Sequence, residues 1–228
     1  MAMDSSSLSG GTSTPGPSMQ GSRRQRRRRE TLEEALDHAV AIMTESGVGG
    51  LTVSEVARRV GIRGPSLYKY FPSLHAVYDA LFARGLREQR AAVLAAIEGT
   101  PRGLARLRAA GVAVVSWSVA NPALAQLLLW RPVPGFQPSA ETFAGSVRES
   151  AEAGEELTEA VRRGELGPEA ATADGQRLLT IVLSGLISLQ LANEPGVPFR
   201  DGAFTRLIDD AFEMYIAHYH PDIRPPAR

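Results

Sequence analysis

Glycines and prolines in the stretch 51–71 mark where two short helices begin and end, and this constrains the fold more than any other feature of the sequence. Thr52 is a good helix N-cap, and Glu55 follows it at the spacing of a capping box. Gly61 ends the helix that begins there, and Pro65 suits the first turn of a new helix. The stretch therefore predicts a helix, a tight glycine turn and a second helix.

The two helices are predicted to share a small apolar core, because their apolar residues recur at helical spacing. Pro72 cannot continue the second helix, which is therefore barely two turns long. The residues that face this core are Val53, Val56, Ala57, Ile62, Leu67 and Phe71. The outer face then carries Ser66, Tyr68, Lys69 and Tyr70. Their hydroxyl, ammonium and aromatic groups suit the major groove of DNA, although an ordinary helical hairpin with solvated polar residues has the same pattern.

A run of arginines lies just before the first helical pattern. Six of the seven residues from Arg23 to Arg29 are arginine. Residues 21–71 hold ten Lys/Arg against six Asp/Glu, a balance of +4, so the rest of this neutral chain carries −4. Such segregation of charge favours a partner with phosphates, and we expect Arg26, Arg27 and Arg28 to contact DNA. The alternative is a solubilising or flexible tail, and entry into a minor groove stays open.

Helical spacing of apolar residues continues through most of the chain, and no segment alternates with the period of two of a half-buried strand. The segment 131–138 contains three prolines and a glycine and is predicted to be a loop. We therefore predict an all-α fold of about nine helices. They are expected near 30–47, 52–61, 65–71, 73–98, 101–120, 123–129, 139–163, 168–193 and 201–220.

Composition and charge divide the chain into four parts. Residues 1–25 are predicted to be a disordered basic tail, because they contain almost no large apolar side chains to offset the entropy of ordering. Residues 26–72 form the predicted helix-turn-helix DNA-binding domain. Residues 73–220 are predicted to form a second helical domain, to which the family resemblance given below assigns effector binding and dimerisation, and residues 221–228 a flexible C-terminus.

The residue types that are missing exclude several classes of chemistry. The chain contains no cysteine, which rules out disulfides, thiolate metal sites and cysteine nucleophiles. His218 and His220 would diverge on a helix, so neither a metal site nor a cofactor is expected. No nucleophile motif is present, and we predict no enzymatic activity. No apolar run reaches the ~20 residues of a membrane span, so a cytoplasmic protein without a membrane partner is expected.

Two motifs carry a resemblance to a known family. They are T-V-x-x-[IV]-A-x-x-x-G-[IV], which begins at Thr52, and L-Y-x-x-F-x-S, which begins at Leu67. Over residues 30–82 the chain resembles the tetracycline-repressor (TetR) family of one-component bacterial regulators. The resemblance implies a three-helix DNA-binding head followed by a helical ligand-binding and dimerisation domain. It also implies that Thr52 holds a phosphate, that Lys69 and Tyr70 mainly grip phosphates, and that the bases are faced by Ser54, Gly64, Pro65, Ser66 and Tyr68.

The chain departs from the family pattern at two positions. Leu74 stands where many relatives have a lysine that contacts a phosphate. This contact to the DNA backbone is therefore not expected here. Gly64 stands where relatives often have a long polar residue, and it has no side chain with which to read a base edge. Specificity is expected to rest on Arg63, Tyr68 and the arginine run instead.

The last two predicted helices suggest a dimer interface. Residues 178–191 are apolar on nearly every face, and the final helix carries a broad apolar stripe. Burial within one subunit is the alternative, but a symmetric DNA site favours a homodimer. The residues predicted for the interface are Leu183, Ile187, Leu191, Phe204, Ile208, Phe212 and Ile216.

Aromatic residues flank the proline-rich loop and could line an effector pocket. They are Trp117, Trp130, Phe136 and Phe143, and they would favour a mainly apolar ligand. Simple filling of the core is an equally good interpretation.

The sequence as a whole predicts a ligand-responsive transcriptional regulator. In the family that it resembles, such a protein is most often a repressor, released from a palindromic double-stranded DNA operator by a small effector. One alternative is a helical small-molecule-binding or enzymatic protein with a degenerate DNA-binding head. Another is a nucleoid-type DNA-binding protein without an effector.

Overall fold

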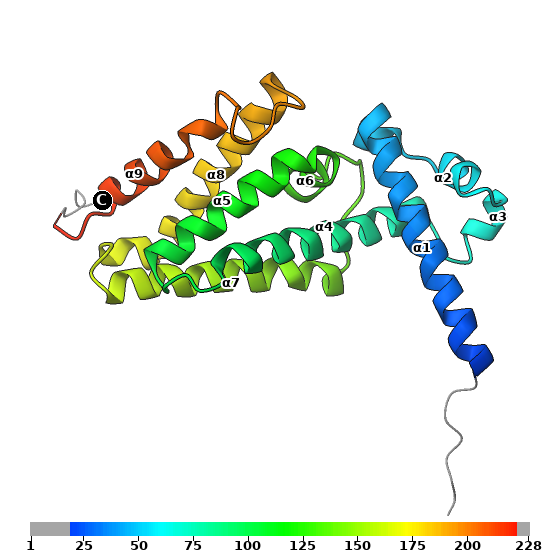
Figure 1. Cartoon of the computed structure of the whole chain (residues 1–228), viewed down its shortest axis with the longest axis horizontal. Coiled ribbons are helices and arrows are strands. Elements are labelled where there is room, and N and C mark those ends of the chain that lie inside the picture. Colours follow the sequence, from blue (N-terminus) through cyan, green and yellow to red (C-terminus); the bar gives the residue numbers. More distant parts are fainter. Residues whose placement is uncertain (1–18, 223–228) are drawn as a thin grey trace, which may run out of the picture.

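The computed structural model describes residues 19–222, which form helices joined by loops (Figure 1). These residues contain nine α-helices, three short 3-10 helices and no β-strand, so the predicted all-α fold is confirmed. The α-helices are α1 (Met19–Ser46), α2 (Val53–Val60), α3 (Gly64–Leu67), α4 (Leu74–Ile97), α5 (Leu104–Ala120), α6 (Pro122–Trp130), α7 (Ala140–Arg162), α8 (Ala173–Asn193) and α9 (Ile208–His218). The 3-10 helices are η1 (Val48–Gly50), η2 (Pro168–Ala171) and η3 (Thr205–Leu207).

The described chain begins with a helix where the sequence predicts part of a disordered tail. The disordered tail predicted for residues 1–25 is wrong for residues 19–25, which belong to α1. Arginine and glutamine are good helix formers, and no proline or glycine interrupts residues 22–46. Residues 1–18, and residues 223–228 of the predicted C-terminus, lie outside the described part.

Helices α1, α2 and α3 form a small head at one end of the molecule (Figure 1). The inner face of α1 is buried through residues such as Ala39 and Ile42, which pack in the same core as Val56 of α2 and Leu67 of α3. α1 ends at Ser46, and Gly47 then has a φ of 75°, a left-handed value that a residue with a side chain rarely adopts. The chain can therefore turn sharply into η1 and α2.

Helix α4 connects this head to the body of the molecule. Its first half packs against the head, where the Tyr78 hydroxyl donates a hydrogen bond to the Val48 carbonyl at 2.6 Å. Tyr78, Leu81 and Phe82 are all buried, and they belong to one apolar cluster that continues from the head into the body. The two parts therefore share a core through α4.

The body is built around α5. Figure 1 shows α4 and α7 on one side of α5, and α8 and α9 on the other. Gly111 allows the close approach of α9, because a Cβ atom at this position would lie 2.6 Å from Cζ of Phe212. α6 continues from α5 after a bend of 116° at Pro122.

Two predicted helices are shorter than expected. α3 has four residues rather than almost two turns, because the chain passes into a turn at Tyr68. α9 begins at Ile208 rather than near residue 201, because the preceding segment forms η3 around the buried Thr205.

Candidate nucleic-acid interface

The turn between α2 and α3 is held by backbone hydrogen bonds. The Gly61 amide donates to the Arg58 carbonyl at 3.2 Å, and the Ile62 amide donates to the Ala57 carbonyl at 3.0 Å. Gly61 has a φ of 75°, so the left-handed cap that ends α2 needs a glycine. Thr52 caps the other end of α2, and its hydroxyl accepts a hydrogen bond from the Glu55 amide at 3.2 Å. The predicted helix-turn-helix is therefore present, with its two helices fixed at the turn.

The last residue of α3 and the residue that follows it differ sharply in burial. Leu67 is fully buried, whereas the next residue, Tyr68, is 52% exposed although it is large and aromatic. The other residues predicted to contact DNA lie at the same surface. Thr52, Ser54, Arg63, Pro65 and Lys69 are exposed, and Gly64, Ser66 and Tyr70 are partly exposed. The head thus presents all the DNA-contacting candidates of α2 and α3 to solvent.

Three of these candidates, Tyr68, Lys69 and Tyr70, follow α3 and lie on a turn and not on a helix. The Tyr70 and Phe71 amides both donate to the Leu67 carbonyl at 2.9 Å, so the chain keeps a right-handed course after α3 ends. The buried ring of Phe71 ties this turn to the core of the head. Tyr68 and Lys69 therefore lie at an exposed corner of the head.

A cluster of ion pairs fixes α2 against α1. The Arg59 guanidinium donates to both carboxylate oxygens of Glu45 on α1, at 2.8 and 2.6 Å, and to Glu55 at 2.8 Å. Arg58 donates to Glu55 through two nitrogens. These hydrogen bonds, first from Arg58 and then from Arg59, lower the pKa of Glu55 to about 2. Only half of the predicted capping box forms, because the Glu55 carboxylate binds these arginines instead of the Thr52 amide.

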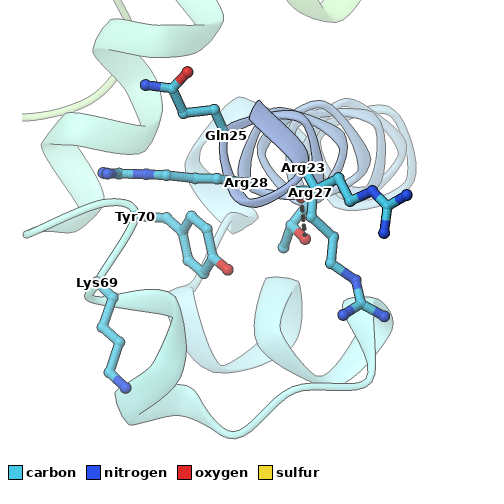
Figure 2. A pocket seen from close by; sticks show the side chains of 7 residues that line it. Arg23, Gln25, Arg27, Arg28, Lys69 and Tyr70 are labelled. Carbon is cyan, nitrogen blue, oxygen red and sulfur yellow. Dashed lines mark hydrogen bonds between the residues drawn. The ribbon is translucent and has the colours of Figure 1, made fainter. Parts of the chain in front are cut away.

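The arginine run belongs to α1, which carries it beside α3. Arg23, Arg27 and Arg28 line a hollow of about 820 Å³ together with Lys69 and Tyr70. Figure 2, which looks along α1, shows the Tyr70 ring between the side chains of Arg27 and Arg28. Arg26, the other predicted contact of this run, is exposed and pairs with Glu30 at 3.4 Å. The predicted basic segment is thus helical where it is described.

The four aromatic residues predicted to line an effector pocket differ in burial. Phe136 is buried against α4, with its ring centroid 5.7 Å from that of Tyr78. Trp117 is also buried, but Trp130 is 44% and Phe143 is 37% exposed. None of the four lines the arginine hollow or the second hollow described next.

The second hollow is an open groove of about 580 Å³ along α5. It lies between α4 and α9, and it is floored by small side chains. Arg108 stands at its rim, where it donates to Asp209 and Glu213 of α9 at 3.0 and 2.9 Å. The residues that line this groove are Ala96, Ala105, Arg108, Ala109, Val112, Ala113, Ser116 and Asp209.

The dimer surface predicted on α8 and α9 needs correction. The assignment is wrong for Ile187, Leu191, Ile208 and Phe212, which are buried within the single chain and cannot reach a partner. They pack inward because α5 lies directly beneath both helices, as the Gly111 contact shows. The other three predicted residues, Leu183, Phe204 and Ile216, are partly exposed.

Different apolar residues are exposed on the outer face of the C-terminal helices. Ile181 is 66% exposed and Leu189 is 49% exposed, both on α8, while Met214 of α9 is 67% exposed. Leu207, at the end of η3, is 44% exposed. We call Ile181, Leu189, Leu207 and Met214 the outer apolar face.

Among the described residues, one single helix, α8, is long and apolar enough to cross a membrane. Core helices of soluble proteins pass this same test.

Metal-binding side chains are dispersed in the part of the chain that the structure describes. No group of three or more His, Asp or Glu residues there could hold a metal ion.

Comparison with known proteins identifies both halves of the molecule. Residues 35–81 match the family described as "Bacterial regulatory proteins, tetR family", and residues 107–211 match "Tetracyclin repressor-like, C-terminal domain". The chain belongs to the TetR family of transcriptional regulators. Members of this family are typically DNA-binding proteins rather than enzymes.

Curated relatives match only part of the chain. The HTH-type transcriptional regulator AqdR of Rhodococcus erythropolis is 36% identical over 69 residues, which are 30% of this chain and 33% of AqdR. The class D tetracycline repressor of Escherichia coli is 37% identical over 49 residues, 22% of each chain. The chain thus matches a third or less of the length of these relatives.

Solved structures share the whole fold. A TetR family transcription regulator from Marinobacter aquaeolei has a TM-score of 0.65 at 15% identity, over 86% of this chain and 99% of that chain. FadR from Bacillus subtilis, solved in complex with stearoyl-CoA, has a TM-score of 0.64 at 17% identity, over 82% and 99% of the two chains. A Rhodococcus protein of unknown function has a TM-score of 0.67 at 22% identity, over 83% and 95%.

Some features of this TetR-family site were missed by reasoning from the sequence. The ion pair between Arg59 and Glu45 joins residues 14 positions apart, and no local pattern signals it. The link between α4 and α7 is another example, because Asp79 accepts hydrogen bonds from the Ser139 amide at 2.7 Å and the Thr142 hydroxyl at 3.0 Å. The only signals in the sequence were the carboxylate of Asp79 on a mainly apolar helix and the N-cap Ser139, 60 residues later.

Proposed function

We propose that this TetR-family regulator is a homodimeric repressor that binds a palindromic operator through α2 and α3, and that a small, mainly apolar effector releases it. The observation that carries the proposal is the pair Leu67 and Tyr68, of which one is fully buried and the other 52% exposed. A large aromatic side chain costs free energy when it is left in water, and here a rigid core aims it outward. Such a residue is suited to reading base edges and thymine methyl groups in the major groove.

The charges around Tyr68 support DNA as the partner. Lys69 is exposed beside it and forms no ion pair within residues 19–222. Arg58 and Arg59, in contrast, are occupied by Glu55 and Glu45, so they fix the head rather than bind a ligand. The residues proposed to contact DNA, Tyr68 and Lys69, are thereby distinct from the arginines whose ion pairs hold the head together.

Operator binding by two head variants tests this assignment. We expect Tyr68→Ala to cost about 1–3 kcal/mol of operator binding, mainly at one or two base positions, with the melting temperature nearly unchanged. Lys69→Ala should weaken binding equally for all sequences and lower the salt slope by about one. A gel-shift series over salt concentration, with the chain's own upstream region as probe, measures both. Unaltered affinity of Tyr68→Ala would contradict the assignment.

The outer apolar face supports a two-fold dimer through α8 and α9. Four large apolar side chains exposed on neighbouring elements would promote aggregation of a monomer, whereas a symmetry mate would bury them. A dimer would hold the two α3 helices about 34–36 Å apart, one turn of DNA. Ile181→Asp with Met214→Asp should therefore give folded monomers that have lost at least about tenfold in operator affinity. Light scattering that found dimers of this variant would place the interface elsewhere.

Helix α4 supplies a route from an effector to the head. Phe136, in the loop before α7, packs on Tyr78 and Phe82 of α4, and Asp79 of α4 holds the first turn of α7. A ligand that displaced this loop would move α4, and with it the head, and so shift the population away from the DNA-binding spacing. FadR, of the same fold, is solved with stearoyl-CoA, which favours an apolar effector class. Ligand-dependent release of the operator by acyl compounds tests this part.

A further inference from the structure

The N-terminal part of α1 extends beyond the head as a continuous helix. α1 begins at Met19, but its first buried residue is Ala35. Figure 1 shows this part projecting past α2 and α3. At 1.5 Å per residue, the twelve positions before Thr31 add about 18 Å of helix. The arginines therefore have a defined direction in space instead of the freedom of a flexible arm.

Arginines of this extension fall on two faces with different surroundings. Arg23 and Arg27 are four residues apart, so they lie above one another on one side, and Arg28 lies next to them. These three line the hollow with Lys69 and Tyr70, as Figure 2 shows. Arg26 and Arg29 do not line it, and Arg26 pairs with Glu30 at 3.4 Å, so the proposal made below withdraws the DNA contact expected for Arg26 from the sequence. The face toward α3 is thus distinct from the rest of the helix.

The hollow holds uncompensated positive charge. Four of its seven lining residues are Lys or Arg, and none is acidic. In the described part of the chain, none of these four cations forms an ion pair, although sixteen ion pairs form elsewhere or beside them. The Tyr70 and Thr31 hydroxyls add polar groups, but Thr31 already donates to the Arg27 carbonyl at 3.1 Å. Mutual repulsion of such charges is relieved by an anion, and guanidinium groups suit phosphates.

The helical state decides between the two DNA contacts open to these arginines. An α-helix with its side chains is about 10–12 Å wide, whereas the minor groove of B-DNA is only about 6 Å wide. A continuous helix through Arg23–Arg29 therefore cannot enter that groove as an extended arm would. Backbone phosphates at the groove's edge remain within reach of arginine side chains on the helix.

We propose that the Arg23–Arg27–Arg28 face of α1, together with Lys69 and Tyr70, is a rigid phosphate clamp that holds the DNA backbone next to each half-site. The inference rests on operator binding by α3, which is the proposed function. Arg23 lies eight positions before Thr31, about 12 Å along the helix, so an extension that runs along the duplex carries the contact over about three to four base pairs, at 3.4 Å each. The clamp contributes affinity and salt dependence but reads no bases.

Two charge-matched double variants of the full-length chain test the clamp. The variant Arg27→Ala with Arg28→Ala removes clamp charges, and Arg26→Ala with Arg29→Ala removes the same charge from the other faces. The probe is the palindromic duplex that the wild type selects from a random-sequence library, with and without about ten base pairs of flank. The clamp variant should lower the salt slope by about two and the affinity about tenfold on the flanked duplex, whereas the control keeps most of both. On the unflanked duplex the clamp variant and the wild type should bind alike.

An insertion separates a rigid clamp from a flexible arm. Two glycines inserted between Arg29 and Glu30 keep every charge but interrupt the helix. A rigid clamp loses about as much affinity from this insertion as from loss of Arg27 and Arg28, whereas a minor-groove arm keeps its affinity, and that result would overturn the proposal. Equal binding by both double variants would overturn it too, while leaving operator recognition intact. Failure of the wild type to select any DNA would instead remove the proposed function itself.

Discussion

The head and the body of this regulator share one apolar core but expose opposite kinds of side chain. In the head, Leu67 is buried and the exposed neighbours Tyr68 and Lys69 carry polar groups. In the body, α9 buries Phe212 and exposes Met214, an apolar residue two positions later. A polar surface suits a reversible contact with a polyanion, and an apolar surface suits a lasting contact with a like surface. The proposed DNA contact, which must be reversible, and the proposed dimer contact, which must last, therefore lie on different parts of the molecule.

The two regions also fix their helices by different means. The head uses exposed ion pairs, in which Arg59 joins Glu45 of α1 to Glu55 of α2. The body uses close approach of helices, as at Gly111 against Phe212. Ion pairs weaken when salt screens them or when the carboxylate is protonated, whereas apolar packing contains no titrating group. Variants of each region should therefore fail in different ways.

The strongest test compares the inner and outer faces of α9. Phe212→Asp would bury a carboxylate against α5, where the ring is now 1% exposed, and should lower the free energy of unfolding by more than about 4 kcal/mol. Met214→Asp, at 67% exposure, should leave a folded protein. Circular dichroism during thermal unfolding measures both. A normal melting temperature for Phe212→Asp would mean that α9 is not part of the body's core.

The matching test in the head uses Leu67. Leu67→Ala leaves a cavity between α2 and α3 and should cost about 2–5 kcal/mol of stability. Tyr68→Ala removes no core contact and serves as the control. Urea unfolding curves give the two values. If both variants were equally destabilised, the sharp division between core and surface at this turn would be wrong.

A smaller effect is expected where head and body meet. Asp79→Asn removes charge from a group that accepts hydrogen bonds from the Ser139 amide and hydroxyl and from Thr142, and should cost about 1–2 kcal/mol. Asp37→Asn is the matched control, because Asp37 pairs with Arg84 in an exposed position, and about 0.5 kcal/mol or less is expected there. Urea unfolding again gives both values. An equal loss of unfolding free energy in the two variants would mean that the Asp79 hydrogen bonds to the start of α7 contribute no more than an exposed ion pair.

The smallest effect is the pH dependence of the head. Hydrogen bonds from Arg58 and Arg59 lower the pKa of Glu55 from 4.5 to about 2. A lowered pKa stabilises the folded state fully above pH 4.5, and this stabilisation is lost as the pH falls toward 2. The difference in melting temperature between the wild type and Glu55→Gln should thus be larger at neutral pH than near pH 3. A difference that grew on acidification would reverse the sign of this argument.

The sequence predicted the head better than the body for a physical reason. In the head, Thr52, Gly61 and Pro65 act on their own neighbours through caps and turns, so a local pattern was enough to place every DNA-contacting candidate at the surface. In the body, whether Ile208 or Leu207 faces inward depends on where α5 lies, and no local pattern carries that information. A stripe of large apolar residues predicts a buried face, but it does not say whether the same chain or a partner covers it.

The structure of the arginine run was predicted wrongly for another reason. Its composition indicated a partner with phosphates, but not the state of the backbone, because arginine is common in flexible tails and in helices alike. The continuation of α1 to Met19 depends on the ordered helix that follows, from which it propagates.

Lys69 gives the DNA-binding corner a chemical label of its own. It is the only lysine in the chain, and it is exposed at the rim of the arginine hollow. A reagent that acylates amines therefore has, besides an α-amino group, a single side chain to modify, and acylation there removes one positive charge from the surface proposed to face DNA. The fraction of chains that escape modification would report directly, in one peptide of a mass spectrum, how much of the protein has this corner covered.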